Sequence, residues 1–320
     1  MPGMNEQLST RVYQLVSDNI QQVMRGKPEV VRLAVVALLA EGHLLIEDVP
    51  GLGKTTLARC LARSIGGEWN RIQFTPDLLP GDVTGVMVYH QNVERFEFHR
   101  GGIFANVVLA DEINRGTPKT QSALLEVMSE RRVTVDSVTN DVPHPFLVIA
   151  TQNPIEMEGT YRLPEAQLDR FLMRVSVGYP DHDAEVRVIM SDCARVSPDE
   201  LQPVVDLQTL QAAITEVRAA HLDPAICSYA VRLADATRKH VAVRYGASPR
   251  GSIALVRAGQ ALAATEGRRF VTPDDIKTVA VPVLAHRLVL TPDAELNQRE
   301  AADIVGEALS ATPAPAINQV

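Results

Sequence analysis

The sequence predicts an α/β protein in which a domain with a mostly parallel sheet is followed by a smaller all-helical domain. Up to residue 180, short apolar runs that suit buried strands alternate with helical patterns, as in βαβ units. Beyond residue 181 the candidate segments are helical only, at 183–194, 207–219, 224–239, 249–265 and 273–287. Three of these helices start with a capping residue followed by proline, at Asp223-Pro224, Ser248-Pro249 and Thr272-Pro273. We therefore expect an α/β domain at 1–181, a helical domain at 182–310 and a disordered tail at 311–320.

The composition indicates a globular protein and argues against several classes of function. With a net charge of −8 and 4% aromatic residues, the chain has no basic block and few side chains for stacking, so no nucleic-acid partner is expected. The three cysteines, Cys60, Cys193 and Cys227, lack metal-ligand spacing, which favours a reducing compartment without structural disulfides. No apolar stretch suits a membrane span or a secretory leader, so a cytoplasmic location is expected.

Residues 44–57, LLIEDVPGLGKTTL, have the pattern of a phosphate-binding loop between a strand and a helix. Loop amides and the positive end of the following helix would face an anion, while Lys54 reaches the outer phosphates. The consensus is G-x-x-x-x-G-K-[ST], and Asp48 stands in its first glycine position. Alone, the stretch also fits an ordinary strand–turn–helix, although phosphate binding is the favoured interpretation. The residues expected to hold the nucleotide are Asp48, Pro50, Gly51, Leu52, Gly53, Lys54, Thr55 and Thr56.

Two acidic residues directly follow the next core strand. The apolar run 107–110 ends in Asp111 and Glu112, and ligand sites gather at the carboxyl ends of buried parallel strands. We expect Asp111 to bind Mg²⁺ together with Thr55, and Glu112 to polarise an attacking water. The alternative, that the two acids cap the next helix, is weaker because Thr117-Pro118 already provides its start signal.

Three further polar residues are candidates for the same nucleotide site once the phosphate-binding loop and the two acids are considered together. Asn153 follows the apolar strand at 146–150 and could contact a terminal phosphate or the attacking water, although by itself it fits a turn before proline. Arg170 lies near the end of a short helix and matters only if the nucleotide of another subunit lies opposite. Arg250 stands in the first turn of a helix, where the helix dipole disfavours a cation, so it hints at a nearby anion.

Two irregular stretches interrupt the alternation of strands and helices, at 75–102 and 131–142. The first contains a candidate hairpin made by 86–90 and 94–99, and the second is a candidate hairpin as a whole. An insertion of this length is either a surface decoration or a functional element, and the sequence alone favours neither.

In this order, the motifs resemble those of the AAA+ ATPases, and more specifically those of the MoxR family, over about residues 10–310. The similar strings are EDVPGLGKT (47–55), TPDLLPGD (75–82), IFAN through LADEINR (103–115), ATQNP (150–154), LPEAQLDRF (163–171) and ASPR (247–250). The resemblance implies a P-loop AAA+ core, with helix-2 and pre-sensor-1 insertions at the two irregular stretches, followed by a helical lid. Asp48 is compatible with the MoxR-type loop, whereas Gly101-Gly102 stands where Gly-Pro is expected.

The resemblance also implies a role for each site residue. Lys54 and Thr55 match the Walker A lysine and magnesium ligand. Asp111 and Glu112 match the Walker B pair. Asn153 matches sensor 1, and Arg250 matches sensor 2. Arg170 is the candidate for an arginine finger that is supplied to a neighbouring subunit.

A protein of this family would hydrolyse ATP with Mg²⁺, assemble as a ring, expected to be a hexamer, and remodel or mature a client protein. The resemblance further implies a partner with a von Willebrand factor A-type domain. Two alternatives remain open, a nucleotide-gated scaffold whose hydrolysis is incidental and a magnesium-chelatase-like motor subunit. The same AAA+ branch includes replicative helicases, which the acidic balance and the scarcity of aromatic residues disfavour.

Overall fold

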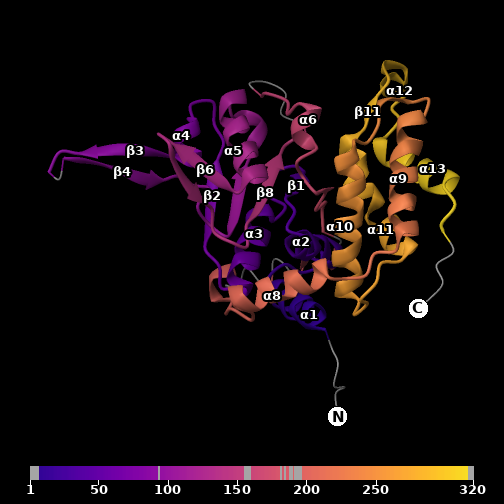
Figure 1. The fold of residues 1–320 in the computed structure, drawn as a ribbon, viewed down its shortest axis with the longest axis horizontal. Coiled ribbons are helices and arrows are strands. Elements are labelled where there is room, and N and C mark those ends of the chain that lie inside the picture. The colour runs from indigo at the N-terminus through magenta and orange to yellow at the C-terminus, as the bar shows by residue number, and fades with distance from the viewer. Residues whose placement is uncertain are drawn as a thin grey trace, which may run out of the picture.

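The computed structural model describes residues 7–92, 94–154, 160–180, 182–183, 185–186, 190 and 197–315. Most of the helix expected at 183–194, including Cys193, lies outside these residues, as do the last five residues of the expected tail. Figure 1 shows a sheet with its covering helices on one side of the molecule and a bundle of helices on the other.

A five-stranded sheet with the order β2–β5–β8–β1–β9 forms the centre of the first part. All of its neighbouring strands pair in parallel, as the sequence predicts. Because the strands are parallel, the segments that follow β1, β5 and β8 leave the sheet at the same edge. The strands are β1 (Leu44–Glu47), β2 (Trp69–Gln73), β5 (Val107–Asp111), β8 (Leu147–Gln152) and β9 (Met173–Val175).

Helices cover both faces of this sheet, so its strands are buried on two sides. Leu44, Ile46, Val107 and Leu109 belong to one apolar cluster, together with residues of α1, α2 and α3. The alternate strand residues, such as Leu45 and Val108, belong to a second cluster with α5. Two-sided burial explains why these strands read as continuous apolar runs. The helices are α1 (Leu8–Gln21), α2 (Pro28–Leu39), α3 (Lys54–Ser64) and α5 (Pro118–Glu130).

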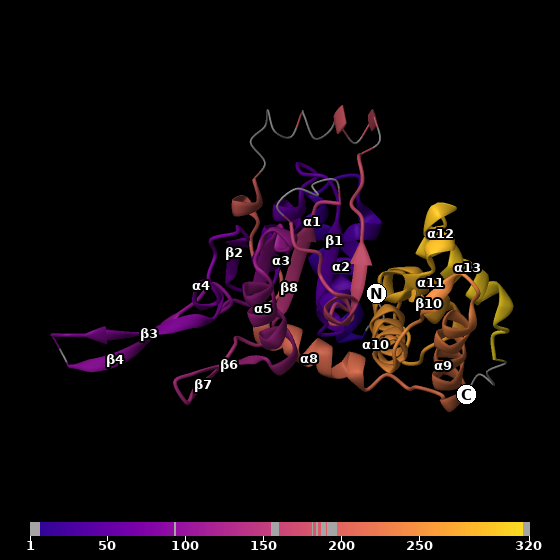
Figure 2. The same ribbon diagram turned by 90° about the horizontal axis from the view of Figure 1, so that it is seen from above.

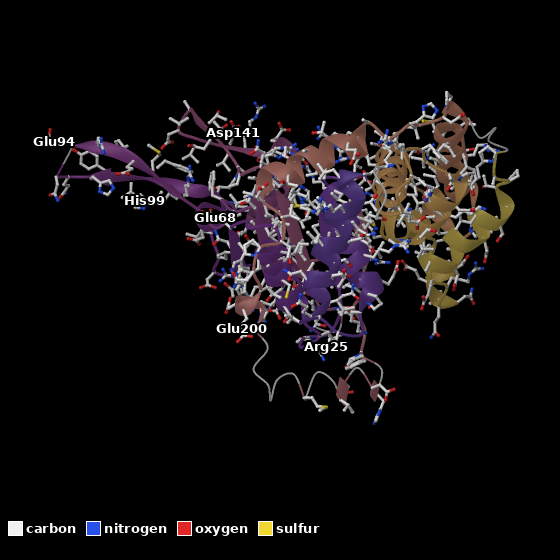
Figure 3. All side chains as sticks on the ribbon, turned by 90° about the horizontal axis from the view of Figure 1, so that it is seen from below. Arg25, Glu68, Glu94, His99, Asp141 and Glu200 are labelled. Carbon is white, nitrogen blue, oxygen red and sulfur yellow. The ribbon has the colours of Figure 1, made fainter. Side chains whose placement is uncertain are left out.

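The two irregular stretches form antiparallel hairpins beside the sheet. β3 (Gly85–His90) pairs with β4 (Arg95–Arg100), and β6 (Arg132–Val135) pairs with β7 (Val138–Asp141). A short helix that the sequence did not predict, α4 (Pro80–Thr84), precedes the first hairpin. Figure 2 shows the β3–β4 ribbon reaching far beyond the other elements. In Figure 3, Glu94 and His99 mark this ribbon, and Asp141 marks the smaller hairpin nearby.

The second part is a helical bundle with one small sheet. The sequence predicted helices only, but β10 (Val243–Tyr245) and β11 (Val289–Leu290) pair as a two-stranded antiparallel ribbon. The segment Ala285–Arg287, expected to continue a helix, is a 3-10 turn. The helices of the bundle are α9 (Pro224–Lys239), α10 (Pro249–Thr265), α11 (Pro273–Leu284), α12 (Pro292–Leu296) and α13 (Ala301–Ala311).

The two parts meet through a continuous core. Helix α8 (Leu207–Arg218), which the sequence analysis placed with the lid, packs across α1 and α2 as well as α10. The helical bundle proper therefore begins at α9. A short helix, α6 (Glu165–Leu168), stands before β9 on the side of the lid. Among the described segments, none of the helices combines the length and the apolar character that crossing a bilayer requires.

Candidate functional site

The loop between β1 and α3 has the backbone of an anion cradle. Gly51 and Gly53 have φ angles of 87° and 84°, which side chains with a Cβ adopt only under strain. Gly53 is the residue before α3, and the first turn of that helix contains no acidic residue. The free N–H groups and positive dipole of the helix start therefore face the loop without a carboxylate from the helix's own first turn.

Some side chains of the loop pack into the core, and others remain available to a ligand. Leu52 packs against the main apolar cluster, so only its backbone can face a ligand. Lys54 Nζ donates to the carbonyl oxygen of Asp48 at 2.5 Å, closing the loop on itself. Burial lowers the pKa of Lys54, and the nearby charges of Asp48, Asp111 and Glu112 oppose this change. Thr55 and Thr56 lie half-buried in the first turn of α3.

The carboxylate of Asp48, which was expected in the nucleotide-binding loop, bonds to other groups of the protein. It accepts hydrogen bonds from Ser176 Oγ at 3.1 Å, from the Gly178 N–H at 3.2 Å and from the Val177 N–H. Asp48 therefore ties the start of the loop to the chain that leaves β9. These hydrogen bonds direct the carboxylate of Asp48 toward residues 176–178.

Asp111, the last residue of β5, is held by groups from the two neighbouring strands. Thr151 Oγ1 donates to Asp111 Oδ1 at 2.6 Å, and Arg71 donates to Oδ2 at 2.6 and 3.1 Å. The carboxylate and the Thr55 hydroxyl are oxygen donors of the kind that Mg²⁺ prefers. Within the described ranges, no group of three His, Cys, Asp or Glu residues could hold a metal alone.

Glu112 adopts a strained backbone conformation immediately after β5. Its φ and ψ angles are 55° and 49°, in the left-handed region that is uncommon for residues with a Cβ. The Glu112 N–H donates to Thr151 Oγ1 at 2.9 Å. Its Oε2 accepts from Gln73 Nε2 at 3.1 Å and from Arg115 at 3.0 Å. Thr151, Gln73 and Arg71 support the acidic pair, and sequence reasoning missed all three.

Asn153 lies at the same edge of the sheet, one residue beyond β8. It is 7% exposed, and its carbonyl oxygen accepts from Asn114 Nδ2 at 3.5 Å. The structure therefore brings Lys54, Asp111, Glu112 and Asn153 to the ends of neighbouring strands.

A cavity of about 550 Å³ lies between the first part of the chain and the lid, and Glu47, the residue before the phosphate loop, is among its lining residues. Its walls come from the start of α2, the end of β9 and the helix α11, including Lys27, Val30, Val177 and Pro282. The volume and the largely apolar walls suit a nucleoside. No motif in the sequence indicates these residues, because they come from three separate segments.

Arg170 and Arg250 lie together, but not near Lys54. Both line a cavity of about 300 Å³ with Gly42, His43 and Leu172, which precede β1 and β9. This is the amino-terminal edge of the sheet, opposite the phosphate loop. Arg170 donates to the Leu125 carbonyl oxygen at 2.8 Å and to Ser129 Oγ.

The arrangement has counterparts among known proteins. A family model described as "ATPase family associated with various cellular activities (AAA)" matches residues 43–173, and an AAA lid domain model matches 235–308. The Mycobacterium tuberculosis protein Chaperone MoxR1 is 41% identical over 333 residues, covering 100% of this chain and 87% of that protein. The Bacillus subtilis protein YeaC, described as uncharacterized, is 50% identical over 301 residues, covering 93% of each. A Cytophaga hutchinsonii protein, solved as a candidate ATPase, superimposes with a TM-score of 0.90 at 36% identity, covering 97% of each chain.

The chain belongs to the MoxR family of AAA+ ATPases. Family membership agrees with the order of motifs along the chain and with the P-loop core followed by a lid. In this MoxR protein, the phosphate loop, the acidic pair and Asn153 form one site. The two arginines belong to a second location, separated from the first by the length of the strands.

Proposed function

We propose that this MoxR-family protein hydrolyses ATP with Mg²⁺ and uses the reaction to remodel or mature a client protein. The observation that carries the proposal is the convergence of the phosphate loop, Asp111, Glu112 and Asn153 at one edge of the sheet. The name of the MoxR1 relative, which includes the word chaperone, supports the client-directed role. We place this activity in the cytoplasm.

Each residue at this edge has a role that its geometry permits. Lys54 and the amides of Gly51–Thr55 hold the β- and γ-phosphates, and the neighbouring cavity takes the base and ribose. Thr55 and Asp111 would hold Mg²⁺, which would supply positive charge to neutralise the phosphates. Glu112 orients the attacking water, and Asn153 contacts that water or the terminal phosphate.

Arg170 and Arg250 act on the nucleotide of another copy in this proposal. Strands rise about 3.3 Å per residue, so even the four residues of β1 place the two arginines roughly 13 Å from their own phosphate loop. A head-to-tail ring, which the family resemblance makes a hexamer, would bring them to the neighbour's nucleotide. An arginine supplied in this way accelerates phosphoryl transfer by about 10³- to 10⁵-fold.

The β3–β4 ribbon is the part of the chain that we assign to client contact. It carries an exposed aromatic pair, Tyr89 and Phe96, with ring centroids 5.1 Å apart. A partner with a von Willebrand factor A-type domain completes the proposal and follows from the family resemblance.

The decisive test compares Glu112→Gln with the parent. The variant should bind ATP and assemble normally but hydrolyse ATP about 100-fold more slowly, because the water is no longer activated. Glu307→Gln, an exposed substitution of the same type in the lid, serves as the control. Hydrolysis by Glu112→Gln at the parental rate would refute the role of Glu112.

Client retention separates a remodelling ATPase from a passive scaffold. Glu112→Gln loaded with ATP should retain its client in a pull-down from extract, and nucleotide-free protein should not. Equal retention with and without ATP would favour the scaffold.

A further inference from the structure

Glu41 is a buried carboxylate at the cavity that contains Arg170 and Arg250. The cavity is lined by five arginines, Arg131, Arg170, Arg250, Arg257 and Arg287, and by only two acidic residues, Glu41 and Asp169. The side chain of Glu41 is 3% exposed. Its φ angle of 50° places it in the left-handed region, at the turn between α2 and β1.

Three arginines from three different helices converge on this residue. Arg131 NH1 lies 2.8 Å from Glu41 Oε1, and Arg218 makes a close ion pair with Oε2. Arg131 and Arg257 also donate to the backbone carbonyl oxygen of Glu41, at 3.3 and 3.1 Å. Arg257 further donates to the carbonyl oxygen of Ala40 at 2.5 Å.

These contacts fix the ends of helices relative to one another. Arg131 directly follows the last residue of α5, and Arg218 is the last residue of α8. Arg257 lies in α10, two turns beyond its start. Through Glu41, the turn before β1 is therefore joined to α5, α8 and α10 at one point.

Two of these helices, α5 and α10, position the two arginines that we assign to the neighbour's nucleotide. The guanidinium of Arg170 rests on the last turns of α5, through Leu125 and Ser129. Arg250 is in the first turn of α10. The spacing between the Arg170 and Arg250 side chains thus depends on how α5 and α10 are held together.

We infer that Glu41 is a positioning residue, which sets the spacing of Arg170 and Arg250 for hydrolysis of the ATP bound to the neighbouring subunit. Glu41 does not contact that nucleotide. The inference rests on the proposed function, since it requires that the two arginines act between subunits. Without the carboxylate, Arg131, Arg218 and Arg257 would repel one another and separate the helices.

The electrostatic state of the cavity agrees with this role. Burial lowers the pKa of Arg257, and the charges of Arg131 and Arg218 lower it further. Burial also lowers the pKa of Arg131. The charges of Arg131 and Arg218 therefore disfavour the charged form of Arg257, and the carboxylate of Glu41 lies between the Arg131 and Arg218 guanidinium groups.

The first test is the ATPase activity of Glu41→Gln, which keeps the volume and removes the charge. Displacing a catalytic group by a fraction of an ångström to 1 Å costs about 10- to 100-fold in rate. We expect the kcat of Glu41→Gln to fall by about tenfold or more while KM for ATP stays within about twofold, since its own phosphate loop is unchanged. A parental kcat would overturn the inference.

Mixing subunits separates positioning between subunits from a general structural defect. Glu112→Gln subunits supply intact arginines but cannot hydrolyse their own ATP. In mixed assemblies with an excess of them, each Glu41→Gln subunit should regain the parental turnover, because its nucleotide then faces the intact arginines of its neighbour. A slow Glu41→Gln that the mixture does not rescue would overturn the inference.

Arg170→Ala, mixed in the same way, tests the proposed function separately. If Arg170→Ala is slow and not rescued, the arginine finger between subunits is wrong. If it is slow and rescued while Glu41→Gln behaves as the parent, only the role of Glu41 fails.

Two further variants keep the test decisive if Glu41→Gln folds poorly. Arg131→Ala removes the partner at the end of α5, whose NH1 lies 2.8 Å from Glu41 Oε1, and should give the same rescued loss of kcat. Arg299→Ala, which breaks an ion pair with Glu307 far out in the lid, is the matched control and should keep the parental kcat. An Arg131→Ala protein that is well folded and fully active would contradict the inference.

Discussion

Arg287 donates its Nε–H to Asp169 Oδ1 at 2.9 Å, and thereby connects the lid to the residue that precedes Arg170. The side chain of Arg287 is 3% exposed. It also donates to the carbonyl oxygens of Phe171, at 2.6 Å, and Leu172, at 3.3 Å. From the start of α10, Ser248 Oγ donates to Asp169 Oδ2 at 2.9 Å. The lid is therefore anchored at two points to the segment that carries Arg170.

Loss of the Arg287 guanidinium should destabilise the protein strongly. Arg287→Met would leave the carboxylate of Asp169 and two carbonyl oxygens without their buried donor. Removing one partner of a buried ion pair typically costs about 3–5 kcal/mol, which we expect for the free energy of unfolding in urea. Arg299→Met, at an exposed ion pair, should cost less than about 1 kcal/mol. Equal losses for the two variants would contradict an anchoring role for Arg287.

Restoring the consensus glycine at position 48 should harm the protein. Asp48→Gly removes the acceptor of three hydrogen bonds, from Ser176, Val177 and Gly178. Leaving the part-buried N–H groups of Val177 and Gly178 unpaired costs about 1 kcal/mol, the low end for a lost hydrogen bond of this kind, and glycine adds freedom to the unfolded chain. We expect a lower urea midpoint and weaker ATP binding, measured by calorimetry.

Asp136→Gly is the matched control for this substitution. Asp136 is exposed in the turn between β6 and β7 and has a φ angle of 47°, so glycine relieves strain there. The control should be neutral or stabilising. An Asp48→Gly protein as stable as the parent would show that the three hydrogen bonds contribute little.

The outcome at Asp48 illustrates what the sequence could predict. The strands, the helix starts and the loop at 48–55 depend on local patterns, and these predictions agree with the structure. The contacts of Asp48 with residues 176–178 join segments that are almost 130 residues apart in the chain. No local sequence pattern indicates that residues so far apart come into contact. The same holds for the pairing of β10 with β11 and for Thr151, whose neighbours in the chain gave no reason to choose it.

The position of Arg250 in the fold is a second example of what the sequence could not predict. Its position in the first turn of a helix was correctly predicted, because the Ser248-Pro249 start signal is local. Which edge of the sheet that helix faces depends on the packing of α10 against α1, α2 and α11, which the sequence pattern does not encode.

Thr151 should control how well the acidic pair binds Mg²⁺. Its hydroxyl donates to Asp111 at 2.6 Å and accepts from the Glu112 N–H at 2.9 Å, so it fixes both residues. Thr151→Val keeps the shape but removes both bonds. Loss of a group that orients a metal ligand commonly weakens metal binding by about 10- to 100-fold. We expect the Mg²⁺ concentration for half-maximal ATPase activity to rise accordingly.

Thr151→Ser distinguishes the hydroxyl from the packing of the side chain. Serine retains the hydroxyl and should restore most of the Mg²⁺ dependence of the parent. If Thr151→Ser and Thr151→Val are equally impaired, packing rather than hydrogen bonding explains the effect.

His43 should make the protein sensitive to mild acid. Its Nδ1 accepts from the Val148 N–H at 3.0 Å and its Nε2 lies 3.0 Å from the Met128 carbonyl oxygen, which fits a neutral ring protonated at Nε2. Burial lowers the pKa of His43 from 6.5 to about 4. Below pH 6.5 the unfolded chain binds a proton at this residue that the folded chain binds only near pH 4. The contribution of neutral His43 to the free energy of unfolding is therefore fully present above pH 6.5 and is lost as the pH falls toward 4.

The difference between the pKa values of His43 in the unfolded and folded chain corresponds to at most about 3 kcal/mol in the free energy of unfolding. His43→Gln provides the comparison, because the amide can accept from Val148 and donate to Met128 but does not titrate. Urea midpoints at several values between pH 7 and pH 4 should fall more steeply for the parent than for His43→Gln. Other groups that titrate in this range, such as the carboxylates, are shared by both proteins and cancel in the comparison. Parallel curves would show that His43 is protonated in the folded protein as readily as in the unfolded chain.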